Sequence, residues 1–241
     1  MPGLAEPAAL GFPALVLIGA LLNLDKQVLG PFMVGRPLVT GLIMGLAAGE
    51  IVSGIWLGLS AELLWMTILP LGGQITPHAG LAVSAALIAW KTGGFAPAAG
   101  TTPDGFVQAT LVIAFLTIPV WARAMGLVDL LGRRLAPASL AKARADLAGD
   151  REPRFLRRNL HGLAATLALS AAVLSAAVLV NTEVLKLATG LAPPAALYNL
   201  GFLYNLVPFI GLLGMAVFMG SKFFPFYLGG LLAGLLVLSA V

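Results

Sequence analysis

The chain has 241 residues, of which 59% are hydrophobic and 10% charged, with a net charge of +4 and a mean hydropathy of +0.99. Soluble domains carry about 25% charged residues, so this composition excludes an ordinary soluble enzyme and indicates an integral membrane protein. The lack of cysteine excludes disulfides, cysteine nucleophiles and cysteine-ligated metal sites.

Eight apolar segments follow one another along the chain, at 7–24, 38–48, 51–71, 80–90, 106–121, 163–180, 195–219 and 223–241. A straight spanning helix needs roughly 20 residues, so 38–48 and 80–90 are too short to cross a bilayer. Short segments with many interruptions, here 29 Gly and 16 Pro in the chain, are typical of transporters with broken helices. We therefore predict an all-α polytopic membrane protein of short and broken helices with re-entrant hairpins, in a single membrane domain over residues 1–241. Each half contains a broken polar segment, a weak indication of pseudo-symmetric halves.

Glu62 is the only charged residue in the apolar segment 51–71. A charge at bilayer depth costs about 2.5 to 3.5 kcal/mol on insertion scales, so such a residue usually has a function. Gly54, Gly58 and Glu62 are spaced four apart and share one helix face, and two such glycines let a neighbouring helix approach closely. Glu62 is thus predicted to face protein or a cavity. Our first interpretation is contact with a polar cargo; the alternative is a structural carboxylate bound to a neighbouring helix.

Further candidate cargo contacts surround this segment. Gln74 and His78 lie in the polar loop 72–78, where the alternative for His78 is a role in structuring the loop. Trp65 is placed to stack on a sugar ring, although aromatic residues in membrane helices more often serve packing. Asp25 and Arg36 are also candidates, and an intramembrane ion pair between them is the favoured alternative.

A basic segment occupies residues 123–160 and holds nine of the fourteen Lys+Arg. It carries +5, so the rest of the chain carries −1, and the positive-inside tendency places it in the cytoplasm near anionic lipid headgroups. Apolar residues among the basic ones predict one or two interfacial helices over 125–149. A docking surface for a soluble partner fits the same charge, whereas nucleic-acid binding is not expected beside membrane helices.

No nucleophile–base triad, P-loop or HExxH-type sequence is present in the chain. We therefore predict no catalytic residue, no metal site and no cofactor. Any energy for transport is expected to come from ions or from partner proteins.

Glycine- and proline-containing motifs are spread over nearly the whole chain. They are Gly35–Arg36–Pro37–Leu38–Val39, Gly54-x-x-x-Gly58-x-x-x-Glu62, Gly72–Gly73, Pro77–His78–Ala79 and, near the end, Phe224–Pro225–Phe226–Tyr227–Leu228–Gly229. In these motifs the chain resembles the IIC component of the mannose/fructose/sorbose family of the phosphoenolpyruvate-dependent sugar phosphotransferase system. His78 stands where relatives often have aspartate or asparagine, which leaves the sugar preference open.

The resemblance implies a sugar-binding and translocating subunit in the bacterial cytoplasmic (inner) membrane, with an oligomeric assembly expected. Such IIC proteins form the channel with the membrane subunit IID, and cytoplasmic IIA and IIB proteins supply the phosphoryl group. The position of Glu62 matches the family's glutamate, which implies that it holds a sugar hydroxyl, and Gln74 and His78 lie in the loop that the family places near the substrate. Relatives usually continue beyond Val241 with another apolar segment, so a last helix is expected to be missing or supplied by a partner.

Two alternatives remain open from the sequence. One is a secondary transporter in which Glu62 titrates and couples an ion to uptake. The other is a non-transporting membrane anchor or sensor that docks phosphotransferase proteins through the basic segment.

Overall fold

The computed structural model describes residues 10–25, 32–65, 77–95, 102–149 and 155–219, and within these ranges it contains helices and no strands. The helices are α1 (Phe12–Leu24), α2 (Pro37–Ala48), α3 (Ile51–Trp65), α4 (Ala79–Thr92), α5 (Pro103–Ala124), α6 (Gly126–Ala148), α7 (Phe155–Leu191) and α8 (Pro194–Met219). The predicted all-α fold is confirmed. The predicted segment 223–241 and Gln74 lie outside the described residues.

The first four helices are short, as the apolar segments predict. The longest of them, α3, has 15 residues and is roughly 22 Å long, less than the roughly 30 Å hydrocarbon core of a bilayer. Helix α2 begins with Pro37, whose fixed φ and missing N–H suit a first helical position. Helices of this length need neighbouring protein around their ends.

Helix α4 is the centre of the bundle. Every residue from 79 to 89 is buried, and α1, α2, α3, α5 and α7 all pack against it. Most of these residues are Ala, Gly and Ser, which let several helices approach one axis at once. A helix that is apolar on every face is expected at such a central position.

Helices α2 and α3 form a tight hairpin. Gly49 adopts the left-handed conformation with a φ of 72°, and its N–H donates to the Leu46 carbonyl. The next N–H, from Glu50, donates to the Gly45 carbonyl, which completes a Schellman turn. The chain therefore reverses within two residues, and the two helices lie against each other along their lengths.

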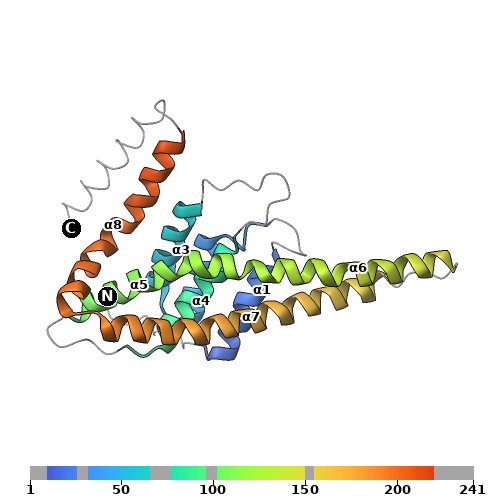
Figure 1. The fold of residues 1–241 in the computed structure, drawn as a ribbon, viewed down its shortest axis with the longest axis horizontal. Helices are drawn as coiled ribbons and strands as arrows, with labels where there is room; N and C mark the ends of the chain where they lie inside the picture. Colours follow the sequence, from blue (N-terminus) through green and yellow to red (C-terminus); the bar gives the residue numbers. More distant parts are fainter. Residues whose placement is uncertain (1–9, 26–31, 66–76, 96–101, 150–154, 220–241) are drawn as a thin grey trace, which may run out of the picture.

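The long helices build the rest of the molecule. Helix α7 has 37 residues and is roughly 55 Å long, and α6 continues beyond α5 and lies along the first part of α7 (Figure 1). We call the projecting pair, α6 with the beginning of α7, the arm. Within the described ranges, two segments, Pro103–Gly132 and Arg157–Leu191, have the length and composition of membrane spans.

The region 125–149, for which one or two interfacial helices are predicted, is a single helix, α6. It projects along the direction of α7 (Figure 1). Helix α7 likewise begins eight residues before the predicted apolar segment 163–180 and ends eleven residues after it. Hydropathy locates only the apolar part of a helix, because charged residues in water do not end helical hydrogen bonding.

Candidate functional site

The glycine face predicted from the sequence is the interface between α2 and α3. A Cβ added to Gly41 would lie 2.3 Å from the Gly54 carbonyl oxygen, and one added to Gly54 would lie 2.3 Å from the Gly41 carbonyl oxygen. Gly58 is similarly close to the Pro37 carbonyl oxygen, at 2.6 Å. The two backbones are therefore in direct contact, and this brings residue 62 to the beginning of α2.

Glu62 lies at the end of this interface, where its carboxylate meets the N-terminus of α2. Arg36 Nη1 donates to Glu62 Oε1 over 3.1 Å, and the Leu38 N–H donates to Oε2 over 3.4 Å. Since Pro37 has no N–H, Leu38 offers the first free donor of the helix. A carboxylate is favourable here because the helix dipole is positive at this end.

The Glu62–Arg36 pair is open to its surroundings. The Glu62 side chain is 13% exposed and the Arg36 side chain 53%. An ionised carboxylate has about four acceptor positions, of which the two described bonds use two, and the guanidinium has five N–H donors. This pair can therefore receive a polar molecule without losing its own contacts.

Asp25 has a different partner from the one predicted. Its Oδ1 accepts from the Phe32 N–H over 2.9 Å, and its Oδ2 accepts from the Gly35 N–H over 3.0 Å. Both carboxylate oxygens thus bind the backbone just before α2, and Arg36 pairs with Glu62 instead. The predicted Asp25–Arg36 ion pair is not formed, because Asp25 is buried at the end of α1 whereas Arg36 extends toward the end of α3.

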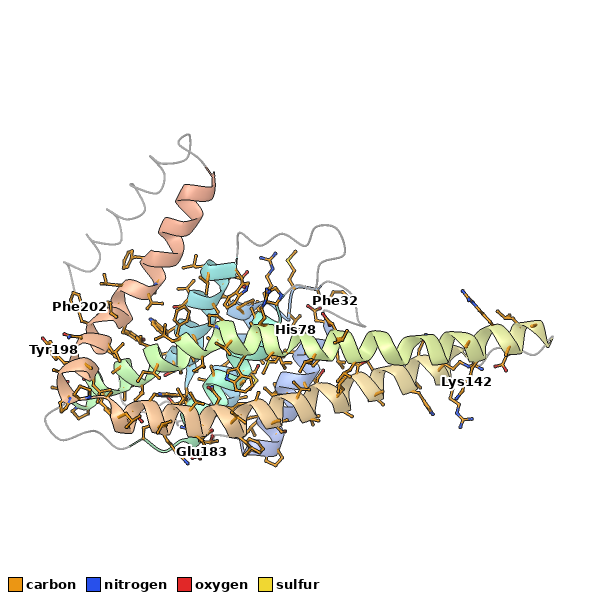
Figure 2. All side chains as sticks on the ribbon, in the orientation of Figure 1. Phe32, His78, Lys142, Glu183, Tyr198 and Phe202 are labelled. Atoms are coloured by element: carbon orange, nitrogen blue, oxygen red, sulfur yellow. The ribbon has the colours of Figure 1, made fainter. Side chains whose placement is uncertain are left out.

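His78 directly precedes α4 and is enclosed. Its side chain is 0% exposed, its Nδ1 lies 3.0 Å from Asn23 Oδ1, and its Nε2 lies 2.9 Å from Asp129 Oδ2. The second distance is that of an ion pair, although the approach lies outside hydrogen-bonding geometry. Asn23 in turn donates from Nδ2 to Ser170 Oγ over 3.0 Å. Figure 2 labels His78 near the junction of α5 and α6.

The remaining candidates do not join these clusters. Trp65 is partly buried and packs against the apolar core, as its structural alternative predicts. The sequence did not single out Trp56, which donates from Nε1 to the Tyr204 carbonyl over 3.2 Å and stacks on the Tyr204 ring at 4.4 Å. Trp56 links α3 to α8, and only the fold reveals this contact.

The sequence also did not single out Asn23, Asp129 or Ser170. Asn23 lies in an apolar run and Asp129 among basic residues, so each could have been flagged as a polar residue out of place. In the described ranges no group of three or more His, Asp or Glu side chains could hold a metal ion.

Short apolar helices packed around a central helix, beside longer apolar helices, fit a helical bundle embedded in a membrane. A family model described as the PTS system sorbose-specific IIC component matches residues 12–240. The chain belongs to this family, and it is therefore a sugar-translocating membrane component of a phosphotransferase system. The family assignment confirms the resemblance seen in the sequence motifs.

Three chains of solved structures also match. One belongs to a cryo-EM structure of the mannose transporter ManYZ in complex with microcin E492 (MceA). That chain is 19% identical, with a TM-score of 0.54, and the match covers 92% of the present chain and 85% of the other. At this identity the similarity shows the fold. No curated protein matches the sequence.

Proposed function

We propose that Glu62 binds a hydroxyl group of the transported sugar, with Gln74 in the following loop as a second contact. The observation that supports this most is the open Glu62–Arg36 pair at the end of the α2–α3 hairpin. The carboxylate is oriented by Arg36 and Leu38 and retains free acceptor positions. Charge-assisted hydrogen bonds of this kind are roughly twice as strong as neutral ones.

The other residues predicted to contact the sugar differ in their proposed roles. Arg36 orients Glu62 and has N–H donors left for a sugar oxygen. Asp25 shapes the segment before α2 through its two backbone contacts, and so acts on the site indirectly. For His78 the burial favours the structuring role over cargo contact.

The family assignment supports a proposal about the partners. We propose that the chain works with a IID membrane subunit in the bacterial inner membrane, as the pairing in the name ManYZ suggests for the matched transporter. Cytoplasmic IIA would phosphorylate a histidine of IIB. A sugar hydroxyl would then attack that phosphorus, so that the P–N bond to histidine breaks and a P–O bond to the sugar forms. The product is charged and does not return through the membrane.

The test is sugar phosphorylation by membranes that contain this chain and its IID partner, supplied with phospho-IIB. A panel of hexoses and amino sugars would be compared, and we expect phosphorylation of one sugar or a small related group. Uptake that follows a pH gradient without phospho-IIB would favour the secondary transporter. Absence of any sugar phosphorylation, with IIB still bound to the membranes, would favour the anchor or sensor.

A further inference from the structure

Two apolar side chains are exposed on the turn 32–36, which directly precedes α2. Phe32 is 73% exposed and Met33 is 57% exposed. The Arg36 N–H donates to the Met33 carbonyl over 3.3 Å, so these residues are the last and first of a β-turn, with Cα atoms within about 7 Å. The Arg36 side chain binds Glu62. The exposed apolar residues therefore lie beside the open Arg36–Glu62 pair.

Three helices hold the turn 32–36 in place. Asp25, directly after α1, accepts from two backbone N–H groups of the turn. Thr40 of α2 donates from Oγ1 to the Val34 carbonyl over 3.3 Å. Gly80 of α4 is so close that an added Cβ would lie 2.3 Å from the Gly35 carbonyl oxygen. A segment fixed in this way needs little ordering when a ligand binds, which favours affinity.

The backbone of Met33 is strained. Its φ is 65°, in the left-handed region that is unfavourable for a residue with a long side chain. Among the described residues, the others with a positive φ are glycines. Strain of this kind persists where the surrounding contacts impose it, and it is concentrated at ligand sites. The contacts from α1, α2 and α4 are what impose it here.

The turn 32–36 lies in polar surroundings. Its backbone is irregular, and in a membrane such backbone is found only where protein or a water-filled cavity covers it. The Arg36 side chain, which is 53% exposed, also needs water or a polar ligand around its remaining N–H donors. Lipid therefore does not account for the exposure of Phe32 on the same turn.

A sugar ring has the chemistry to contact both kinds of group. Its hydroxyls can bond to a carboxylate or a guanidinium, and its C–H groups can pack on the electron-rich face of an aromatic ring. Small-molecule sites commonly combine apolar walls with a few polar groups that fix orientation. Trp65, for which stacking on a sugar is predicted from the sequence, packs against the apolar core instead. Phe32 offers an exposed aromatic ring next to the polar pair.

We propose that Phe32 is the stacking wall of the sugar site, with its ring on the C–H face of a cyclic sugar while Glu62 binds a hydroxyl of the same ring. Met33 borders this wall, and the fixed turn sets its distance from the carboxylate. The inference rests on the proposed sugar contact of Glu62 and adds the apolar half of that site. Phe32 is thereby a residue that selects a cyclic sugar.

The test is equilibrium binding of the hexose that the phosphorylation panel shows to be the best substrate. It would be measured with the full chain and its IID partner in lipid nanodiscs. We expect Phe32→Ala to weaken binding about three- to tenfold, the value of an aromatic contact. Phe32→Tyr retains the ring and should bind within about twofold of the wild type. Because Phe32 is exposed, the melting temperature should stay unchanged in both variants.

Phe202→Ala is the matched control. Phe202 is 67% exposed on α8, away from Phe32 (Figure 2), and its loss should leave sugar binding unchanged. An equal loss of affinity in Phe202→Ala, or in Phe32→Tyr, would overturn the proposal.

The same measurement on Glu62→Gln separates this inference from the proposed function. Weaker binding in Glu62→Gln with unchanged binding in Phe32→Ala would overturn the stacking wall and leave the carboxylate contact standing. Unchanged binding in both variants would overturn the carboxylate contact as well.

Discussion

Two side-chain pairs of this protein, the Arg36–Glu62 ion pair and the His78–Asp129 contact, differ in their access to the surroundings. Arg36 and Glu62 meet at the end of the α2–α3 hairpin, with 53% and 13% of their side chains exposed. His78 and Asp129 meet at the base of the arm, where the His78 side chain is 0% exposed, the Asp129 side chain is 15% exposed, and further polar contacts of His78 reach α1 and α7. The residues of each pair are well separated along the chain, although Arg36 and Glu62 belong to one helical hairpin.

This difference in exposure distinguishes a pair that can bind a ligand, Arg36 with Glu62, from a buried residue that positions helices, His78. A partly open pair can add a ligand because part of its donor and acceptor capacity is unused, and its loss costs the fold little. An enclosed ring such as that of His78 has no room for a ligand, and the loss of its partners leaves buried polar atoms unsatisfied. We therefore expect changes at Arg36 and Glu62 to affect function more than stability, and changes around His78 to affect stability first.

The largest effect is expected from breaking the hairpin that carries Glu62. In Gly41→Val the new side chain would overlap the α3 backbone, since even a Cβ would lie 2.3 Å from the Gly54 carbonyl oxygen. We expect at least about 3 kcal/mol of destabilisation, the upper end for overpacked interiors. Size-exclusion profiles of the purified protein would show aggregation. Gly162→Val, at a position with no atom within 4 Å of an added Cβ, should behave as the wild type.

Removing the amide next to His78 should cost less. Asn23→Leu leaves the His78 Nδ1 and the Ser170 hydroxyl without their partner, and a buried unsatisfied polar group costs about 1–3 kcal/mol. Thermal unfolding would measure the loss. Asn159→Leu, at an exposed position of α7, should change stability by less than about 0.5 kcal/mol. Equal effects of the two variants would refute the structural importance of the enclosed network.

Arg36→Gln tests the open Arg36–Glu62 pair, where we expect sugar affinity to change more than stability. Because Arg36 is half exposed, we expect a change in stability of less than about 1 kcal/mol. We also expect sugar affinity to fall about fivefold, or about 1 kcal/mol, because Glu62 loses the group that orients it. Calorimetric titration with the transported sugar tests this. A loss of stability as large as that of Asn23→Leu would remove the distinction between the two pairs.

The smallest effect is expected at a pair that belongs to neither cluster. Lys186 and Glu183 form an exposed ion pair within α7, three residues apart. Pairs of this kind stabilise helices by about 0.2–0.5 kcal/mol. Lys186→Gln should therefore leave unfolding and sugar affinity within error of the wild type. A large effect would indicate that a partner covers this face.

The sequence predicts the parts of the molecule that depend on local spacing. Gly54, Gly58 and Glu62 recur at helical spacing, so their common face and its close contact with another helix could be predicted. The short helices follow from interrupted apolar runs in the same way. These features need no knowledge of the fold.

The features that the sequence did not predict depend on which helices become neighbours in the fold. Asp25 and Arg36 are close in sequence, but Arg36 binds a residue 26 positions away, and the sequence does not reveal this partner. His78 is bound by Asn23, 55 positions away, and through it by Ser170, 147 positions from Asn23. Burial of the polar loop end was therefore not predictable. The direction of α6 depends in the same way on its packing against α7.

The most direct test of the account compares the two ends of the hairpin. Glu62 pairs with Arg36 at one end, and Glu50 pairs with Lys91 at the other. Equilibrium binding of the transported sugar would be measured for wild type, Glu62→Gln and Glu50→Gln in lipid nanodiscs with the IID partner. We predict that Glu62→Gln weakens binding about 10- to 100-fold, the value of a hydrogen bond to a charged group, while Glu50→Gln binds as the wild type. Unchanged affinity in Glu62→Gln would contradict the claim that this carboxylate holds the sugar.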